Sequence, residues 1–198
     1  TAGHLAMYIT PKSLTISQLL SAESEQYVVP AYQRRYSWHE KQLWELLDDI
    51  SLLEGNDTHL LGSIVCLTGH HTAGINKLEL VDGQQRLTTI CILLQCLADR
   101  LKTDGETGAA QDVERLLLAK ALGEQPVLKI LLDSLDASEF ERHLANKDLD
   151  QPQNRNLAGA FSTFRKWIAE KRLADLGTFL YRLKNQCIVI RLEVSDAK

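Results

Sequence analysis

Hydrophobic and polar residues follow two different rhythms along this chain, and together they predict an α+β fold. Apolar residues spaced three and four apart predict helices, whereas short β-branched or alternating runs predict strands. The predicted helices cover residues 15–22, the segment between Ser37 and Gly55, and roughly 84–102, 111–122, 136–146, 153–171 and 173–184. The predicted extended segments cover residues 26–30, 60–67, 77–81 and 186–194.

Local signals place the ends of several of these elements. Ser37 with Glu40, and Asp136 with Glu139, have the spacing of capping boxes at helix N-termini. The polar segment 68–76 separates two strand patterns, which we therefore expect to pair antiparallel. The closing β-branched run is expected to join the same sheet.

These elements suggest a small mixed β-sheet with an added helical part. Residues 10–102, completed by strand 186–194, form the predicted sheet-containing core. A polar segment at 103–110 separates this core from a predicted helical subdomain at 103–184. Residues 1–6 precede Met7 and are excluded from the fold prediction. A length of 198 residues suits one sizeable domain, or one domain with a helical appendage.

Composition narrows the functional classes. The chain is 44% hydrophobic and 24% charged, which is ordinary for a soluble globular protein, and it has neither a secretory signal nor an apolar run long enough for a membrane span. We therefore expect a cytoplasmic protein with no membrane partner. Its net charge of −4, without a basic block, argues against a simple DNA-binding module.

Cysteine and histidine offer no convincing metal site. The four cysteines lie in apolar patterns without a Cys-x-x-Cys pair, so we expect buried free thiols: Cys66, Cys91, Cys96 and Cys187. His70 and His71 are adjacent and have no carboxylate or cysteine at ligand spacing nearby. They are predicted to lie in a solvated loop.

The most informative stretch is residues 82–89, Asp-Gly-Gln-Gln-Arg-Leu-Thr-Thr, between a predicted strand and a long predicted helix. The N-terminus of a helix has unpaired N–H groups and a partial positive charge, which attract anions. Gly83 permits close approach of the backbone to a ligand, and Arg86 can donate two hydrogen bonds to a phosphate. The alternative is an Asp-Gly turn that simply begins a helix.

Three ordered motifs resemble those of one family. Residues 82–89 resemble the signature of the ParB-like N-terminal domain of GmrSD-type restriction proteins. Residues 29–38, Val-Pro-Ala-Tyr-Gln-Arg-Arg-Tyr-Ser-Trp, resemble its Pro-x-Tyr-Gln-Arg-x-Tyr-x-Trp segment, and residues 60–65 resemble the glycine-containing strand between them. The resemblance implies a sheet of ParB/sulfiredoxin-like type and a chain that is the N-terminal part of a longer protein. Gln84 and Gln85 occupy the turn where sulfiredoxins need cysteine, so sulfiredoxin chemistry is rejected.

The resemblance also implies roles for individual residues. Asp82 and Arg86 are the predicted catalytic residues. The predicted nucleotide-binding residues are Gln33, Arg34, Gly83, Gln84, Gln85, Arg86 and Thr88. Two arginines converging on a triphosphate would match the charge that builds up on a transferred phosphoryl group.

Structural alternatives remain open for several of these residues. Asp82 is either a helix cap or a group that holds Mg²⁺ or water. Arg86 is a phosphate ligand, a surface arginine or an arginine paired with Asp82. The Thr88 hydroxyl either meets the ligand or bonds its own backbone. Tyr32, Tyr36 and Trp38 alternate and are predicted to share one face of an extended segment that pins it to the core.

The function that the resemblance implies is Mg²⁺-dependent binding and hydrolysis of a nucleoside triphosphate, controlling a downstream nuclease domain in a restriction or antiphage system. The chain has no Walker P-loop, so such an NTPase would be of another type. The alternatives are a nucleotide- or modified-DNA-sensing module that does not hydrolyse its ligand, and an interaction scaffold. Further expected partners are DNA, through a C-terminal region, and a second copy in a homodimer.

Overall fold

A computed structural model describes residues 7–69, 72–147 and 151–196, and it has the α+β architecture expected from the sequence. The predicted loop histidines, His70 and His71, lie outside the described residues. The helices are α1 (Ile16–Leu20), α2 (Glu40–Ser51), α3 (Gln84–Thr103), α4 (Thr107–Leu116), α5 (Ala137–Leu144), α6 (Arg155–Ala169) and α7 (Leu173–Asn185). Among the described residues, no helix has the length and apolar character needed to cross a bilayer.

Six of the strands form one mixed sheet in the order β1-β8-β3-β4-β2-β7, and two short strands form a separate hairpin. The strands of the sheet are β1 (Met7–Thr15), β2 (Glu25–Val29), β3 (His59–Thr68), β4 (Asn76–Asp82), β7 (Ile130–Leu132) and β8 (Cys187–Asp196). The hairpin pairs β5 (Leu118–Ala119) with β6 (Val127–Leu128).

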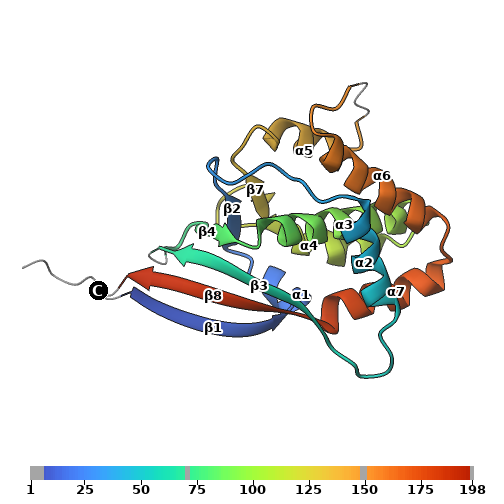
Figure 1. The fold of residues 1–198 in the computed structure, drawn as a ribbon, viewed down its shortest axis with the longest axis horizontal. Helices are drawn as coiled ribbons and strands as arrows, with labels where there is room; N and C mark the ends of the chain where they lie inside the picture. Colours follow the sequence, from blue (N-terminus) through green and yellow to red (C-terminus); the bar gives the residue numbers. More distant parts are fainter. Residues whose placement is uncertain (1–6, 70–71, 148–150, 197–198) are drawn as a thin grey trace, which may run out of the picture.

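Strand β8 lies between the first and third strands of the chain. It pairs antiparallel with β1 and parallel with β3. The three strands form a long ribbon that extends away from the helices (Figure 1). The predicted antiparallel pairing of β3 with β4 and the predicted joining of the closing strand to the sheet are both confirmed.

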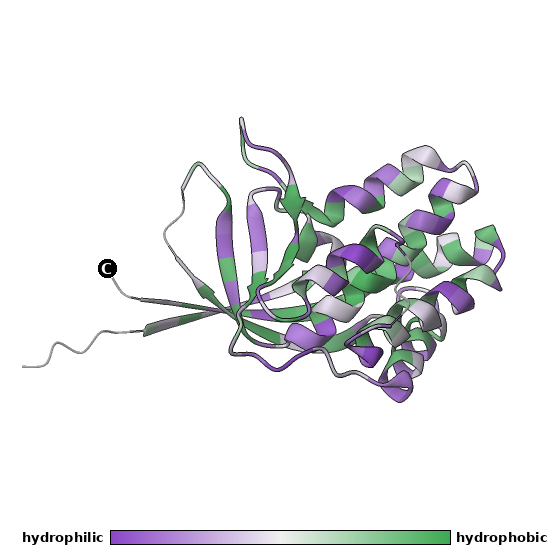
Figure 2. Ribbon diagram, turned by 90° about the horizontal axis from the view of Figure 1, so that it is seen from above, coloured by the Kyte–Doolittle hydropathy of each residue, from purple (hydrophilic) through white to green (hydrophobic). Residues whose placement is uncertain are grey.

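Alternation of side chains gives the sheet one buried face. Ile64 and Cys66 of β3, Leu80 of β4 and Val189 of β8 are almost fully buried, whereas their neighbours along each strand are more exposed. The buried face packs against the helices, and Figure 2 shows apolar and polar residues alternating along those helices. Buried apolar residues recur every second position along the strands and every three to four positions along the helices, and together they form one core.

Helix α3 runs through this core. Apolar residues lie on nearly all of its sides, and both α4 and α6 pack against it. Buried residues before and after residue 103, such as Leu94 and Phe161, belong to one hydrophobic cluster. The helical second half therefore shares its core with the sheet.

Several strands differ from the sequence-based prediction. Strand β1 was not predicted, because its burial is low and its apolar residues at 7–9 are exposed. The predicted helix at 111–122 was misplaced, since α4 spans 107–116 and residues 118–119 are β5. Strand β7, only three residues long, was missed because so short an apolar run has no period to detect.

The predicted helix caps also need correction. Helix α2 begins at Glu40 with His39 as N-cap, and the N–H of His39 donates to Gln42 Oε1 at 2.7 Å, so the predicted Ser37–Glu40 capping box was wrong by two residues. Asp136 does precede α5, but its carboxylate accepts no bond from that helix. The carboxylate instead serves the segment at 35–36.

Gly83 connects β4 to α3. Both its backbone conformation and the close contact around it favour glycine at this position. Its φ is +86°, in the left-handed region. A Cβ at this position would lie 2.6 Å from Ile64 Cγ2 and 2.9 Å from the carbonyl oxygen of Ser63. The turn therefore lies directly against β3, which fixes where α3 begins.

Replacing Gly83 with alanine should lower the free energy of unfolding by about 2–4 kcal/mol, because left-handed backbone and the clash with β3 each contribute. Gly105→Ala is the matched control, since Gly105 also has a positive φ of +81° but no atom within 4 Å of its added Cβ. We expect the control to lose only about 1 kcal/mol. Equal losses in urea unfolding would contradict a role for the contact with β3.

Candidate functional site

The turn between β4 and α3 presents an open helix N-terminus. No side chain of the described residues caps α3, and the N–H of Leu87 bonds to the Gly83 carbonyl as the first turn closes. The N–H groups of the residues before Leu87 therefore have no helical acceptor. Such a terminus carries partial positive charge and can bind an anion.

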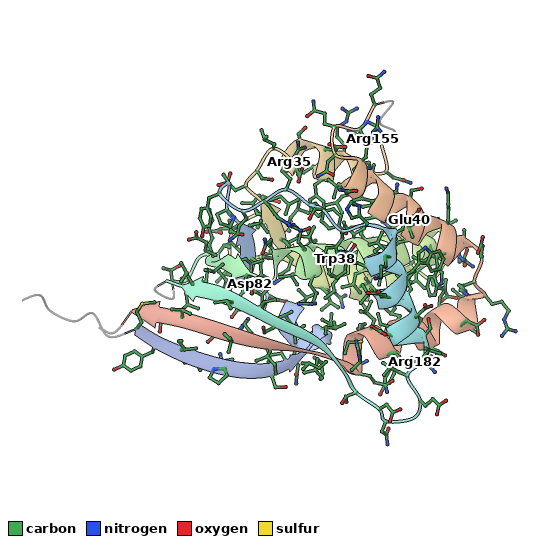
Figure 3. All side chains as sticks on the ribbon, viewed as in Figure 1. Arg35, Trp38, Glu40, Asp82, Arg155 and Arg182 are labelled. Carbon is green, nitrogen blue, oxygen red and sulfur yellow. The ribbon has the colours of Figure 1, made fainter. Side chains whose placement is uncertain are left out.

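Asp82 does not cap this helix, so of the two alternatives for this residue the helix cap is not found. Its Oδ1 instead accepts the N–H of the next residue, Gly83, at 2.9 Å. Asp82 is exposed, and Figure 3 shows it near β3 and β4 at the start of α3. Its second carboxylate oxygen has no partner among the described residues, which leaves it available to a cation or water.

Gln33 and Gln84 tie the segment at 30–38 to this turn. Gln33 Nε2 donates to the carbonyl oxygens of Leu80 and Val81, at 3.2 and 3.0 Å. Gln33 Oε1 accepts a hydrogen bond from Gln84 Nε2 at 3.1 Å. These two of the three predicted nucleotide-binding amides are therefore engaged within the protein.

Gln85 makes the same kind of connection further along the segment. Its Oε1 accepts the N–H of Ser37 at 2.8 Å, and its Nε2 donates to the carbonyl of Arg35 at 3.1 Å. One turn on, the Thr89 hydroxyl lies 2.8 Å from the hydroxyl of Tyr36. Burial raises the pKa of the Tyr36 phenol above its usual range, so this hydroxyl stays protonated near neutral pH.

A buried carboxylate that sequence reasoning assigned only to a helix cap anchors the segment from its other side. Asp136 accepts hydrogen bonds from Arg35 Nε at 2.8 Å, from the Tyr36 N–H at 2.9 Å and from Asn154 Nδ2 at 3.0 Å. Asn154 also donates to the Tyr36 carbonyl and caps α6. Asp136 and Asn154 are 100 or more residues away from the residues they bond in this segment, so no local spacing could reveal them.

Arg34 lies beside the amide residues of α3. It is exposed, and its Nη2 donates to the hydroxyl of Ser37 at 2.5 Å. A cavity at this point holds only about 10 Å³, room for at most one water rather than for a nucleotide. The lining residues include Arg34, Tyr36, Gln84, Gln85, Thr88 and Asp136.

Arg86 lies on a different side of the helix and does not line this cavity. Its guanidinium packs on β3, where a Cβ at Gly62 would lie 2.6 Å from Arg86 Nη1. Gly62 itself has a φ of +127° beside an irregularity in the pairing with β8. Any side chain at position 62 would overlap this guanidinium, so Gly62 makes room for Arg86.

Neither arginine is committed to an ion pair. Among the described residues, no carboxylate lies within 4.0 Å of Arg34 or Arg86, so the predicted alternative of an Arg86–Asp82 pair is not found. By contrast, Arg35 lies 2.7 Å from Asp136. Both motif arginines thus retain donors for an external anion.

The aromatic residues of the segment do not share one face, so that prediction was wrong. Tyr32 is 69% exposed and donates to Glu79, whereas Tyr36 is buried and Trp38 is packed against the core. The backbone here is irregular rather than a strand, so the period of two that the prediction assumed does not hold.

The described residues contain no cluster of three His, Cys, Asp or Glu side chains that would hold a metal ion alone. The cysteines are buried free thiols, as predicted from their apolar surroundings. Burial raises the pKa of Cys66 to about 11 and that of Cys91 to about 12. Any metal at Asp82 would therefore need ligands from water or from a bound molecule.

The fold and the turn define an α+β domain in which a strand and a left-handed glycine lead into a helix whose N-terminus has no side-chain cap. A family model described as the GmrSD restriction endonuclease, N-terminal domain, matches residues 16–198. The chain belongs to this family, which places it in a restriction system. No curated protein matches the sequence closely enough to add a relative.

Replacing Gln85 with alanine should loosen the segment at 30–38. Loss of this amide leaves the Ser37 N–H and the Arg35 carbonyl without partners, which should cost about 1–3 kcal/mol. Hydrogen exchange at the Ser37 amide is the measurement, and it should accelerate. Gln95→Ala is the control, because the side chain of Gln95 donates to Asp99 on its own helix and to no other side chain of the described residues, and it should leave this amide unchanged.

Proposed function

We propose that this domain binds a nucleoside triphosphate with its phosphates at the N-terminus of α3, and that the protein hydrolyses it with Mg²⁺ to control a nuclease. The observation that carries the proposal is the uncapped turn at Gly83. It is flanked by Arg34 and Arg86, for which no ion pair is found within the described part of the chain. Unpaired backbone N–H groups, helix charge and guanidinium donors are the elements with which proteins hold phosphate.

The two arginines would approach the phosphates from different sides. Arg34 extends from the segment at 30–38, and Arg86 from the side of α3 that faces Gly62. A phosphate chain lying across the start of α3 could meet both. Such an arrangement would stabilise charge that develops during phosphoryl transfer.

Asp82 fits the role of a Mg²⁺ or water ligand better than that of a helix cap. Mg²⁺ is commonly held by one or two carboxylates together with phosphates and water, so a lone exposed carboxylate beside a phosphate site suffices. The metal would neutralise phosphate charge when bound. Asp82 would hold it, and the free carboxylate oxygen could instead orient the attacking water.

The base and sugar need more room than the closed cavity provides. The segment at 30–38 is held over α3 by amide hydrogen bonds, chiefly from Gln33 and Gln85. We infer that ligand binding exchanges some of these bonds for contacts with the nucleotide, which opens the segment. Gln33, Gln84 and Thr88 would then meet the ligand only in the open form.

The same hydrogen bonds favour a second candidate, a sensing module that binds a nucleotide or a modified base without hydrolysis. The amide side chains already hydrogen-bond within the protein and hold the segment at 30–38 closed. Breaking these bonds when a ligand binds would change the conformation of the segment without any chemical step. Saturable nucleotide binding without phosphate release would support the sensing module. An interaction scaffold would show neither nucleotide binding nor phosphate release.

Nucleotide binding should raise the melting temperature of the chain. At a hundredfold excess over Kd, the matching triphosphate among ATP, GTP, CTP and UTP with Mg²⁺ should add about 2.7 kcal/mol, or roughly 5–10 °C. Arg86→Ala should weaken binding about 10- to 100-fold through loss of charged hydrogen bonds, and so reduce the shift to about half or less.

Arg155→Ala is the matched control for this measurement. Arg155 is an exposed arginine on the first turn of α6, and it has no ion pair among the described residues (Figure 3). The control should keep the full shift. A shift that is absent for every nucleotide, or equal in Arg86→Ala, would overturn the proposed phosphate site.

Asp82→Asn should separate binding from hydrolysis. The amide keeps the side-chain size but loses the charge that holds Mg²⁺ or activates water, so phosphate release by the full-length protein should fall roughly 10²- to 10⁴-fold. The thermal shift with nucleotide alone should persist. Asp57→Asn removes another exposed carboxylate and should change neither readout, whereas unchanged hydrolysis in Asp82→Asn would exclude the proposed role.

A further inference from the structure

The segment at 30–38 is held on two sides by contacts of different chemistry. On the side of α3 the contacts are hydrogen bonds of neutral amides, such as those of Gln85. On the other side, the buried carboxylate of Asp136 accepts hydrogen bonds from Arg35 Nε and from the Tyr36 N–H. The second set of contacts therefore includes a charge that is removed from water.

Arg35 and Asp136 form the charged contact of this second set. Arg35 Nε and Nη2 lie 2.8 and 2.7 Å from Asp136 Oδ1, and Figure 3 shows Arg35 beside α5, at whose start Asp136 lies. The Arg35 side chain is 40% exposed, whereas Asp136 is only 1% exposed. A hydrogen bond between charged groups is stronger than one between neutral groups, and a buried carboxylate that loses its partner is costly.

Asn154 attaches this contact to the helical part of the chain. Its Nδ2 donates to Asp136 Oδ1 and to the carbonyl of Tyr36, both at 3.0 Å. Its Oδ1 caps α6, and its backbone N–H donates to Glu139 on α5 at 3.0 Å. The carboxylate that holds the segment is thus fixed to the starts of two helices, so it cannot easily follow the segment outward.

Asp136 also lines the cavity of about 10 Å³ beside Gln84, which is too small for a nucleotide. Enlarging this cavity moves the segment away from Asp136 and breaks the bonds from Arg35 and Tyr36. An incoming nucleotide can replace amide hydrogen bonds with its own donors and acceptors. Its phosphates accept hydrogen bonds, as the carboxylate does, so they cannot replace the donors that Asp136 loses.

We propose that the Arg35–Asp136 pair is an autoinhibitory contact, which holds the segment at 30–38 closed against a nucleoside triphosphate. The inference rests on the proposed function, because the ligand that the contact opposes is the proposed one. When only the open form binds, the apparent affinity is reduced by the fraction of the chain that is open. Weakening the pair therefore raises the affinity, whereas removing a residue that holds phosphate lowers it.

Arg35→Met tests the autoinhibitory contact, because methionine keeps an apolar stem and lacks the guanidinium. In calorimetric titrations with ATP, GTP, CTP and UTP and Mg²⁺, the variant should bind the preferred nucleotide about 5- to 20-fold more tightly than the unmodified chain. This factor is the lower part of the range for a charged hydrogen bond, since Arg35 is partly exposed. Equal or weaker binding would overturn the proposal, and weaker binding is the result expected if Arg35 itself holds phosphate.

Asp136→Asn removes the charge from the other partner and keeps the size of the side chain. It should tighten binding by a similar factor. Because both substitutions break the same pair, the double variant should bind no more tightly than either single variant. Gains that add in the double variant, or weaker binding by Asp136→Asn, would overturn the pair as the autoinhibitory contact.

Arg172→Met is the matched control, since it removes an arginine whose Nε lies 3.0 Å from Asp175 Oδ2 on α7, away from the segment. The nucleotide affinity of this variant should be unchanged, and a gain equal to that of Arg35→Met would overturn the proposal. Absence of binding in the unmodified chain and in all variants would overturn the proposed function and the autoinhibitory contact with it. Equal binding by the unmodified chain and Arg35→Met would overturn the autoinhibitory contact alone.

Discussion

The contact between the Gly83 turn and strand β3 fixes the geometry on which the candidate site depends. A side chain at Gly83 would overlap Ile64 and the Ser63 carbonyl, so α3 starts against the sheet only because this residue is glycine. The start of α3 then determines the position of its N–H groups and of Arg86. Two residues upstream of this contact on β3, Gly62 makes room for the Arg86 guanidinium. The two glycines together bring the helix and its arginine onto one strand.

Polar contacts hold the segment at 30–38 in addition to the packing of Tyr36 and Trp38 against the core. Gln33, Gln84 and Gln85 connect it to the turn, while Asp136 and Asn154 hold its other side. Hydrogen bonds can be exchanged for others at little net cost, whereas packed apolar contacts cannot. The segment is therefore a more suitable mobile part than α3, and its release is the step that the proposed nucleotide site requires.

The sequence predicted those helices and strands in which the spacing or type of the apolar residues shows which side is buried. Helices α3, α6 and α7 have long apolar periods, and β8 is strongly β-branched, so their predicted ranges were confirmed within a few residues. Strand β1 was not predicted because it lies at the edge of the sheet and buries few of its side chains. Strand β7 was not predicted because three residues are too few to show an alternation of apolar and polar positions. The motif residues were identified from the sequence, but their partners were not, since Asp136 and Asn154 meet them only in the folded chain.

The spacing of the motif residues did not predict the direction in which each side chain of α3 points. Successive helical residues are separated by about 100°, so Arg86 is about 200° from both Gln84 and Thr88. Gln84, Gln85 and Thr88 therefore face the segment that carries Arg34, while Arg86 faces β3. Two arginines that converge in one pocket were expected from the sequence, but the helix separates them to different sides of its own N-terminus. A ligand that contacts both must lie across the end of the helix, where the unpaired N–H groups are, rather than in the closed cavity beside it.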